Sequence, residues 1–264
     1  MLKNIKKFSS IENLFEFYEN EFQVDSKALL NSKLSWALDD NDNMLPKIRF
    51  QQDQSTVVKS KNNITFEIQI NFIEDLKYHR KTSSRSKELI SRACGWKLGC
   101  RKLLDLTAGF GVDAIFLAQL GFDVLSLERN PILFIMLNQA LDHAKQTQPD
   151  NDLWKRLKFQ YDDGSNFILK SLNDINYNKQ FDVVYYDPMY PHKSKTALPS
   201  KEMQFLRSIV GQDEANADVV KLAQRFSKLL TVVKRPILAP LVVNNPSFTL
   251  ESKLVRFDIY KNKI

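Results

Sequence analysis

From residue 102 onward, short apolar runs alternate with longer stretches that have a helical pattern. The apolar runs predict five strands, at 102–106, 123–127, 157–161, 181–186 and 229–233. Helices are expected between them, at 111–120, 131–146, 163–172 and 200–228, the last broken near Gly211. This alternation predicts an α/β fold with a mostly parallel sheet and helices on both faces. Such sheets bind ligands at the carboxyl ends of their strands, so the residues that follow each run are candidates for a site.

The first part of the chain has a different pattern. Apolar residues occupy every second position from Ile64 to Phe72, which predicts a half-buried strand. Shorter apolar runs at 34–38 and 48–50 are candidates to pair with it. We therefore expect these segments to belong to a small α+β part of the chain that precedes the main sheet.

These patterns divide the chain in two. We expect a small N-terminal α+β subdomain over residues 1–75 and a main domain over residues 76–264, with a helix at 84–94 leading into the main sheet. The alternating segment 253–261 predicts one further strand, antiparallel and at the edge of that sheet.

Composition excludes several classes of protein. The chain has 264 residues, of which 43% are hydrophobic, as expected for a globular protein. Two Cys and three His are too few for a disulfide framework or a His-rich metal site. The N-terminus lacks the apolar core of a secretory signal, and no apolar run is long enough to span a membrane. We expect a cytoplasmic protein without metal, whose net charge of +7 permits a polyanionic partner without requiring one.

A glycine-containing turn follows the first strand of the main domain. Asp105 ends the strand, and Gly109 and Gly111 come directly before the next helix. Two glycines at this spacing let the backbone turn sharply and approach a ligand closely. The sequence also fits the dinucleotide-binding pattern G-x-G-x-x-A, with Ala114 in the third place, and a tight turn without a ligand is the simpler alternative.

Acidic residues follow the next two strands. Glu128 stands where a carboxylate can accept two hydrogen bonds from a ribose diol, although a solvated position before a helix that opens at Pro131 is the alternative. Asp163 stands where an acid can meet an adenine amino group, and a helix N-cap is an equally good interpretation. These positions favour a nucleoside ligand without identifying it.

The most distinctive loop follows the fourth strand and reads Asp187-Pro188-Met189-Tyr190. A carboxylate and a backbone carbonyl can accept hydrogen bonds from the exocyclic amine of a base, while an aromatic ring stacks on the face of the base. Pro188 restricts the preceding residue and stiffens the loop. A simple Asp-Pro turn is the alternative, but it gives no reason for the glycine turn and the acid on neighbouring strands.

These motifs resemble class I methyltransferases that use S-adenosylmethionine, whose amino-methylating members carry D/N-P-P-Y/F; here Met189 replaces the second proline. Longer stretches are similar to the ribosomal RNA small subunit methyltransferase J family. They include LDLTAGFGVDAIFLAQLG, LERNP, DPMYPHKSKTAL, KEMQFLRSIVG, VVKRP and RFDIY. The similarity runs from about residue 76 to the end and includes YHRK at 78–81, whereas the first 75 residues match only loosely.

The resemblance implies a Rossmann-like methyltransferase domain over 76–264 that uses S-adenosylmethionine as its cofactor. It implies methyl transfer to the exocyclic N2 of a guanosine in 16S ribosomal RNA, with the RNA or the small ribosomal subunit as partner. Beside the turn residues Asp105, Gly109 and Gly111, it implies cofactor contacts at Val112, Asp113, Glu128, Arg129, Asp163, Gly164 and Asp187. The family usually has two serines where this chain has Asp163 and Gly164.

Roles follow for the loop after the fourth strand. We assign Asp187 and the Pro188 carbonyl to the amine protons, and Tyr190 to stacking on the base. Basic residues near this loop and before the main domain are candidates to hold RNA phosphates: Arg80, Lys81, Arg85, Lys193, Lys195, Lys234 and Arg235. A solvated charged face is the alternative for some of them.

Three other functions remain open on the residues alone. An amino-methyltransferase acting on adenine or cytosine of DNA or another RNA would use the same loop. A nucleotide-binding oxidoreductase is compatible with the glycine turn but gives no role to Asp187 and Tyr190. A noncatalytic RNA-binding module gives no role to the glycine turn or to Glu128.

Overall fold

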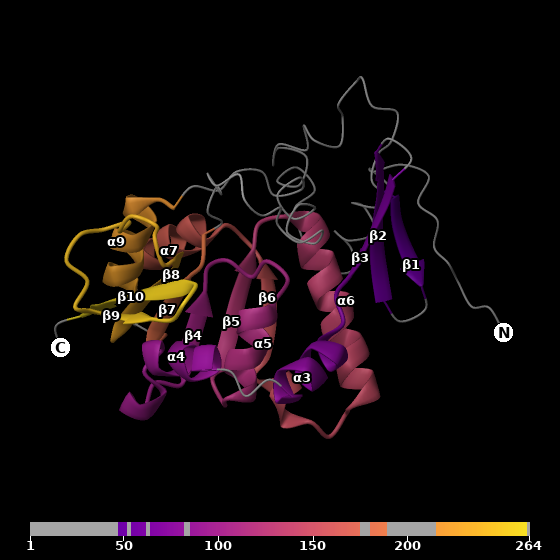
Figure 1. The fold of residues 1–264 in the computed structure, drawn as a ribbon, viewed down its shortest axis with the longest axis horizontal. Coiled ribbons are helices and arrows are strands. Elements are labelled where there is room, and N and C mark those ends of the chain that lie inside the picture. The colour runs from indigo at the N-terminus through magenta and orange to yellow at the C-terminus, as the bar shows by residue number, and fades with distance from the viewer. Residues whose placement is uncertain are drawn as a thin grey trace.

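The structure, a computed structural model, describes residues 47–51, 54–61, 64–81, 85–174, 180–188 and 215–262. Its first strands form a three-stranded antiparallel sheet in the order β1-β2-β3 (Figure 1). The strands are β1 (Lys47–Gln51), β2 (Gln54–Lys61) and β3 (Ile64–Gln69). Strand β1 pairs with β2, and β2 pairs with β3. Strand β2 was not predicted from the sequence. The expected pairing of 48–50 with the third strand is therefore wrong, and the run at 34–38 lies outside the described residues.

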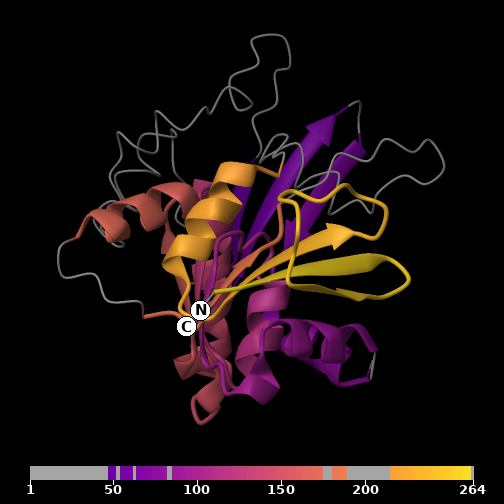
Figure 2. The same ribbon diagram turned by 90° about the vertical axis from the view of Figure 1, so that its left-hand side faces the viewer.

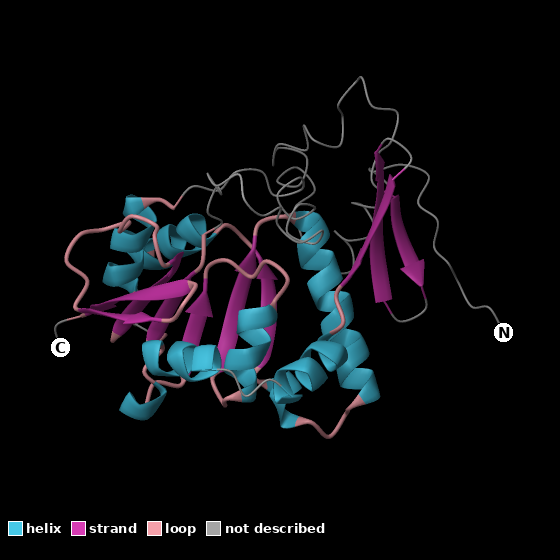
Figure 3. Ribbon diagram, in the orientation of Figure 1, coloured by secondary structure: helices cyan, strands magenta, loops and turns pink. Residues whose placement is uncertain are grey.

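The main sheet has seven strands in the order β6-β5-β4-β7-β8-β10-β9 (Figure 3). The first five in this order are parallel to one another, which confirms the predicted α/β class. Strand β10 runs antiparallel to both of its neighbours. The strands are β4 (Lys102–Asp105), β5 (Asp123–Glu128), β6 (Leu157–Tyr161), β7 (Val183–Tyr186), β8 (Leu230–Pro236), β9 (Phe248–Glu251) and β10 (Val255–Lys261).

The described helices cover both faces of this sheet (Figure 2). They are α3 (Phe72–Lys81), α4 (Arg85–Ala93), α5 (Val112–Gln119), α6 (Pro131–Thr147), α7 (Gly164–Asn173) and α9 (Ala217–Phe226), with short 3₁₀ turns at Trp96–Leu98 and Asp152–Lys155. Helices α3 to α6 pack on one face, and α7 and α9 on the other. Because strand side chains alternate, Leu103 and Val183 join the first layer while Leu104 and Val184 join the second.

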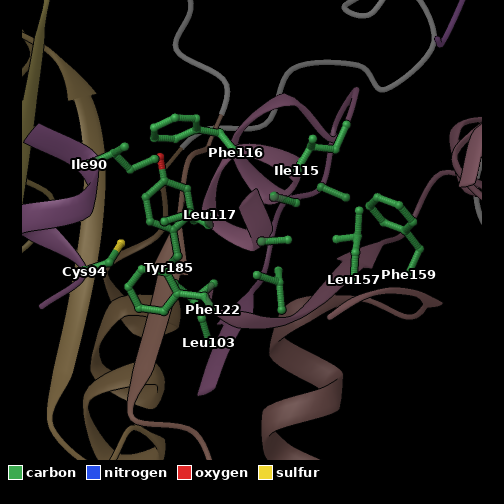
Figure 4. Packing of buried hydrophobic residues seen from close by; sticks show 14 of the residues in the cluster. Ile90, Cys94, Leu103, Ile115, Phe116, Leu117, Phe122, Leu157, Phe159 and Tyr185 are labelled. Carbon is green, nitrogen blue, oxygen red and sulfur yellow. The ribbon is translucent and has the colours of Figure 1, made fainter. Parts of the chain in front are cut away.

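The larger core lies between α4, α5 and the middle of the sheet (Figure 4). Tyr185 of β7 is almost fully buried there, with Leu103 of the adjacent strand β4. Figure 4 shows its ring among Ile90, Leu117 and Phe122, with its hydroxyl directed toward the side of Phe116. A tyrosine in this place brings a polar atom through an apolar layer to the carboxyl edge of the sheet.

Two sequence predictions differ from the structure at strand ends. The strand expected to reach Phe72 ends at Gln69, and helix α3 begins at Phe72 because the side chain of Asn71 accepts a hydrogen bond from the backbone N–H of Glu74. Phe72 is buried in the main core. It is therefore apolar because it packs in that core and not because it continues the alternating pattern of the strand. The C-terminal strand is antiparallel, as predicted, but it is not the edge, because β9 pairs with its outer side.

The N-terminal sheet and the main domain are in contact. Strand β2 lies alongside helix α6, as Figure 1 shows, and helix α3 packs on α5 and α6. The long helix expected over 200–228 is described only from residue 215 onward, where α9 begins after the N-cap Asn216. No helix within the described residues is long and apolar enough to cross a membrane.

The turn after β4 depends on two glycines with left-handed backbones. Gly109 has φ 55° and Gly111 has φ 75°, and Gly111 directly precedes helix α5. A Cβ on Gly111 would lie 2.9 Å from the Leu137 side chain and 3.2 Å from Phe159, whereas a Cβ on Gly109 would meet nothing within 4 Å. Gly111 is therefore required for packing as well as for backbone conformation, while Gly109 faces open space.

This contrast gives a matched pair of variants. Gly111→Ala should lower the free energy of unfolding by the cost of the left-handed backbone, about 1–2 kcal/mol, plus about 1–3 kcal/mol for crowding Leu137 and Phe159. Gly109→Ala should lose the backbone contribution alone. Urea unfolding of both variants measures the difference, and equal losses would contradict the assigned packing role of Gly111.

Candidate functional site

Four parallel strands end in polar residues at one edge of the sheet. Asp105 ends β4 and Glu128 ends β5, while Asp187 follows β7 and Lys234 lies near the end of β8. Because these strands are parallel and adjacent, their carboxyl ends meet at the same edge. The sequence predicts that the candidate residues after the strands lie close together. Those that the structure describes do so.

Asp105 organises the turn that follows β4. It is buried, and its Oδ1 atom accepts a hydrogen bond from the backbone N–H of Thr107 at 3.0 Å. The hydroxyl of Ser126, on β5, donates to Oδ2 at 2.6 Å. The hydroxyl of Thr107 accepts a hydrogen bond from the backbone N–H of Asp187 at 2.8 Å. The glycine turn and the loop after β7 are thus joined through a single threonine hydroxyl.

Glu128 holds the same turn from the other side. Its Oε2 atom accepts a hydrogen bond from the backbone N–H of Gly109 at 3.0 Å, and its Oε1 atom accepts one from Asn130 at 2.7 Å. The side chain of Asn130 accepts from Leu133 N, within the first turn of α6. The sequence alternative of a solvated position is wrong, because Glu128 is only 5% exposed.

Burial changes the acidity of both carboxyl groups. Desolvation raises the pKa of Asp105 to about 7, against the lowering effect of its hydrogen bonds from Ser126 and Thr107. Desolvation likewise raises the pKa of Glu128 to about 7, against the hydrogen bonds from Asn130 and Gly109. Both groups therefore change protonation near neutral pH.

A second cluster lies between helix α5, β7 and β8. The ammonium Nζ of Lys234 lies 2.6 Å from Oδ2 of Asp113 and 2.9 Å from Oδ2 of Asp187. The hydroxyl of Tyr185 donates to the same Asp113 oxygen at 2.7 Å. Asp113 is in the first turn of α5, so this cluster links the helix after the glycine turn to the loop after β7.

The charges in this cluster depend on one another. Burial opposes the charge on Lys234, but Asp113 and Asp187 outweigh it and raise its pKa, so the ammonium stays protonated. Desolvation raises the pKa of Asp187, and Lys234 works against that effect. Desolvation also raises the pKa of the Tyr185 hydroxyl, which therefore remains a hydrogen-bond donor.

The third pair of implied cofactor residues has a clear structural role. Asp163 is the N-cap of α7, and its carboxylate accepts hydrogen bonds from the backbone N–H groups of Ser165 and Asn166. The N-cap interpretation of Asp163 is therefore confirmed. The guanidinium Nη1 atom of Arg129 lies 3.9 Å from Oδ2 of Asp163. A Cβ on Gly164 would lie 2.9 Å from the Leu106 side chain, so glycine allows α7 to approach the end of β4.

The predicted RNA-contact residues are not all placed alike. Arg80 and Lys81 lie in α3 and Arg85 begins α4, while Lys193, Lys195 and the stacking residue Tyr190 lie outside the described residues. Lys234 is bound by two carboxylates, and Arg235 is only 4% exposed. These last two positions do not suit the phosphate contacts expected of them, because neither presents its charge to a ligand at the surface.

Three residues that sequence reasoning passed over support the site. Thr107 and Ser126 position Asp105 and the loop after β7, and Tyr185 positions Asp113. Ser126 and Tyr185 are hydroxyl residues within largely apolar strands, and Thr107 lies two residues after the end of another. That pattern is the signal in the sequence, since a hydroxyl buried at a strand end needs a polar partner nearby.

The described residues fit S-adenosylmethionine by the chemistry of their donors and acceptors. Glu128 is a buried carboxylate beside the glycine turn, with lone pairs beyond the two that its backbone partners use. Gly109 leaves open space on its Cβ side, and Val112 exposes 40% of its surface at the start of α5. A ribose diol can therefore meet a carboxylate and an adenine can meet an apolar side chain. Within the described residues, no group of three or more His, Cys, Asp or Glu is arranged to hold a metal ion.

Comparison with known proteins agrees with this arrangement. A family model described as "Putative SAM-dependent methyltransferase" matches residues 31–262. The protein named Ribosomal RNA small subunit methyltransferase J from Bdellovibrio bacteriovorus is 37% identical over 185 residues, which cover 70% of each chain. The chain belongs to the ribosomal RNA small subunit methyltransferase J family. A member from Coxiella burnetii, strain Dugway 5J108-111, is 38% identical over 195 residues, which cover 72% of this chain and 73% of that one.

A solved structure supports the same conclusion about the fold. The SAM-dependent methyltransferase NGO1261 from Neisseria gonorrhoeae superposes with a TM-score of 0.59 at 25% sequence identity. The match covers 78% of this chain and 79% of that one. The Rossmann-like methyltransferase fold implied by the motifs is therefore confirmed, with S-adenosylmethionine as the methyl donor of the family.

The raised pKa of Asp105 predicts how stability depends on pH. Because its pKa in the folded protein, about 7, exceeds the ordinary value of 3.8, its stabilising contribution is complete below about pH 4 and is lost as the pH rises through 7. The free energy of unfolding should therefore fall between about pH 4 and pH 7 and level off above that range. Asp105→Asn cannot ionise and should make this fall shallower, which urea unfolding at several pH values measures. Parallel curves for the variant and the wild type would contradict the assignment.

Glu128 should control cofactor affinity. Glu128→Gln keeps the size of the side chain but loses the charge that accepts hydrogen bonds from a ribose diol, each worth about 1.5–3 kcal/mol. Calorimetric affinity for S-adenosylmethionine should fall by about tenfold or more. It should also rise less between pH 6 and pH 8 than in the wild type, because the wild-type carboxyl deprotonates near pH 7. Unchanged affinity with unchanged pH dependence would remove Glu128 from the cofactor site.

Proposed function

We propose that this chain transfers the methyl group of S-adenosylmethionine to the exocyclic N2 amine of a guanosine in 16S ribosomal RNA. The names of its relatives describe methyltransferases of small-subunit ribosomal RNA. The choice of an amine as acceptor rests on the similarity of Asp187-Pro188-Met189-Tyr190 to the amino-methylating signature.

One observation carries the proposal in the structure. The backbone N–H of Asp187 donates to the Thr107 hydroxyl at 2.8 Å, which fixes the start of the Asp-Pro loop beside the glycine turn. In amino-methylation the acceptor amine and the methyl group must be within bonding reach of each other. A loop that binds the amine and a turn that binds the cofactor therefore need this kind of direct connection.

The reaction places defined demands on the protein. S-adenosylmethionine, when bound, supplies a methyl group made electrophilic by a sulfonium. The N2 lone pair of guanine is delocalised into the ring, so the protein must orient the amine and stabilise the positive charge that grows on it. We assign the Asp187 carboxylate and the Pro188 carbonyl to the amine protons and Tyr190 to stacking on the base. No strong base is needed before attack, because the amine proton becomes acidic only as the N–C bond forms.

The RNA would reach this edge of the sheet with its target base unstacked or flipped out. We propose that five basic residues contact its phosphates. Lys193 and Lys195 follow Asp187-Pro188-Met189-Tyr190 in the sequence, and Arg80, Lys81 and Arg85 belong to the helices that lead into the main domain. The substrate is 16S ribosomal RNA alone or within the small ribosomal subunit, and the reaction takes place in the cytoplasm.

We also propose that residues 1–75 form a small α+β subdomain and residues 76–264 the methyltransferase domain. The three-stranded sheet of β1 to β3 supports the first part. Phe72, at the start of α3, is already buried in the main core, so we place the connection between the two parts a few residues before the boundary at 75, between β3 and α3.

The function is tested by methyl transfer from labelled S-adenosylmethionine to small ribosomal subunits and to free 16S RNA, both from a strain that lacks its own family member. Mass spectrometry of the digested nucleosides should find N2-methylguanosine at one position. Methylated adenosine or cytidine would instead support the alternative amino-methyltransferase. Label on neither RNA substrate would overturn the proposal.

Asp187 should be the most sensitive position. Asp187→Asn keeps the shape of the side chain but loses its charge, and loss of one such preorganised electrostatic contact typically costs about 100–1,000-fold in turnover. Single-turnover methyl transfer measures the effect. Asp182→Asn is the matched control, because Asp182 precedes the same strand and binds the backbone N–H groups of Arg101 and Lys102 at the opposite edge. Turnover near the wild-type value in Asp187→Asn would refute the assigned role.

A further inference from the structure

Lys234 lies between two carboxylates that come from different parts of the fold. Its Nζ atom is 2.6 Å from Asp113 and 2.9 Å from Asp187, and only 23% of its side chain is exposed. Asp113 and Asp187 are themselves 28% and 34% exposed. The ammonium of Lys234 contacts both carboxylates in a half-buried place. It is therefore not placed to make the RNA phosphate contact that was expected from the sequence.

The register of the sheet explains how the three groups meet. Strands β7 and β8 are parallel, with Tyr186 opposite Val233, so the next residues along each strand, Asp187 and Lys234, come beside each other. Side chains alternate along strands, and Tyr185, two positions before Asp187, belongs to the core layer on the α5 face. Asp187 and Lys234 therefore point to the face where the first turn of α5 presents Asp113.

The cluster joins the two loops on which the proposed reaction depends. Asp113 is fixed to the glycine turn through α5, and it also accepts the Tyr185 hydroxyl hydrogen at 2.7 Å. Asp187 begins the loop that we assign to the acceptor amine. Without the ammonium, two carboxylates would share one half-buried site, and repulsion would favour protonation of one of them or separation of the pair. Either outcome would displace or neutralise the Asp187 carboxylate.

We propose that Lys234 is a positioning residue for methyl transfer. It keeps the Asp187 carboxylate charged and holds it in a fixed position relative to Asp113 and the glycine turn. It acts through Asp187 and touches no reacting atom. The inference rests on the proposed function, because the role of Asp187 in orienting the amine is part of that proposal.

The other charged groups around Asp187 define what the test must separate. They come from β4, α5, β7 and β8: the charged or titratable groups are Asp105, Asp113, Lys234 and Arg235, together with the uncharged hydroxyl of Tyr185. Of these, Lys234 has a direct ion pair with Asp187 and opposes the rise in its pKa, while Asp113 adds to that rise. Removing Lys234 should therefore move the titration of Asp187 to higher pH.

The experiment compares Lys234→Met, which removes the charge and keeps the length, with Lys234→Arg, which retains a charge. We expect Lys234→Met to lower single-turnover methyl transfer at least tenfold at pH 7 and to move the acidic limb of the pH profile upward by a unit or more, with KM for RNA little changed. Lys234→Arg should keep the acidic limb near its wild-type position. Adding Asp113→Asn to Lys234→Met should return the limb toward lower pH, because the opposing carboxylate is gone.

Lys228→Met is the matched control. Lys228 lies two residues before the same strand and pairs with Asp182 at 3.9 Å at the opposite edge of the sheet, so the same change there should leave turnover and its pH profile as in the wild type. A purely structural role for Lys234 predicts a lower melting temperature with the acidic limb unmoved. That result, or wild-type turnover in Lys234→Met, would overturn the proposal.

A separate measurement distinguishes this inference from the proposed function. The Asp187 carboxyl, labelled with ¹³C and assigned through Asp187→Asn, can be titrated by NMR without RNA. If the wild type methylates no RNA, the proposed function fails, and a higher titration midpoint in Lys234→Met still supports the link between Lys234 and Asp187. An unchanged midpoint overturns the link whatever the RNA assay shows.

Discussion

Four carboxylates converge on the carboxyl edge of the main sheet, and the balance of their charges governs the rest of the site. Asp105 and Glu128 are balanced by backbone N–H groups and by the hydroxyls of Ser126 and Thr107, and both have a pKa of about 7. Asp113 and Asp187 share the ammonium of Lys234. The two halves are joined by Thr107, which donates to Asp105 and accepts from the backbone of Asp187. A change at any one carboxylate therefore alters the field at the others.

This arrangement places stability and function in opposition. Burying a carboxylate costs free energy, and the raised pKa values of Asp105 and Glu128 record that cost. The same burial excludes water and strengthens each hydrogen bond that the carboxylates make to a ligand. The apolar layers on both faces of the sheet supply the stability that allows this, since Leu103 and Leu104, one facing each layer, are both fully buried directly before Asp105.

Much of this could be predicted from the sequence, because the main sheet follows a strong rule. Short apolar runs separated by helical stretches predicted the parallel strands, and the acids after them fell at one edge as that topology requires. The strand β9 was missed because its apolar alternation, although regular, extends over only four residues. Lys234 was misjudged for a different reason. A lysine near the end of a strand looks like a surface charge until the register places it beside Asp187, 47 residues earlier in the chain.

The two ends of the same strand pair show why charge alone did not identify the site. At the amino end, Asp182 lies 3.9 Å from Lys228 and accepts hydrogen bonds from two backbone N–H groups, so its charge is balanced without the lysine. At the carboxyl end, Lys234 lies 2.9 Å from Asp187 and also binds Asp113. Both pairs join Asp and Lys across β7 and β8. Only the second brings two like charges together, and a fold retains such a costly arrangement where a carboxylate must be held charged and in place.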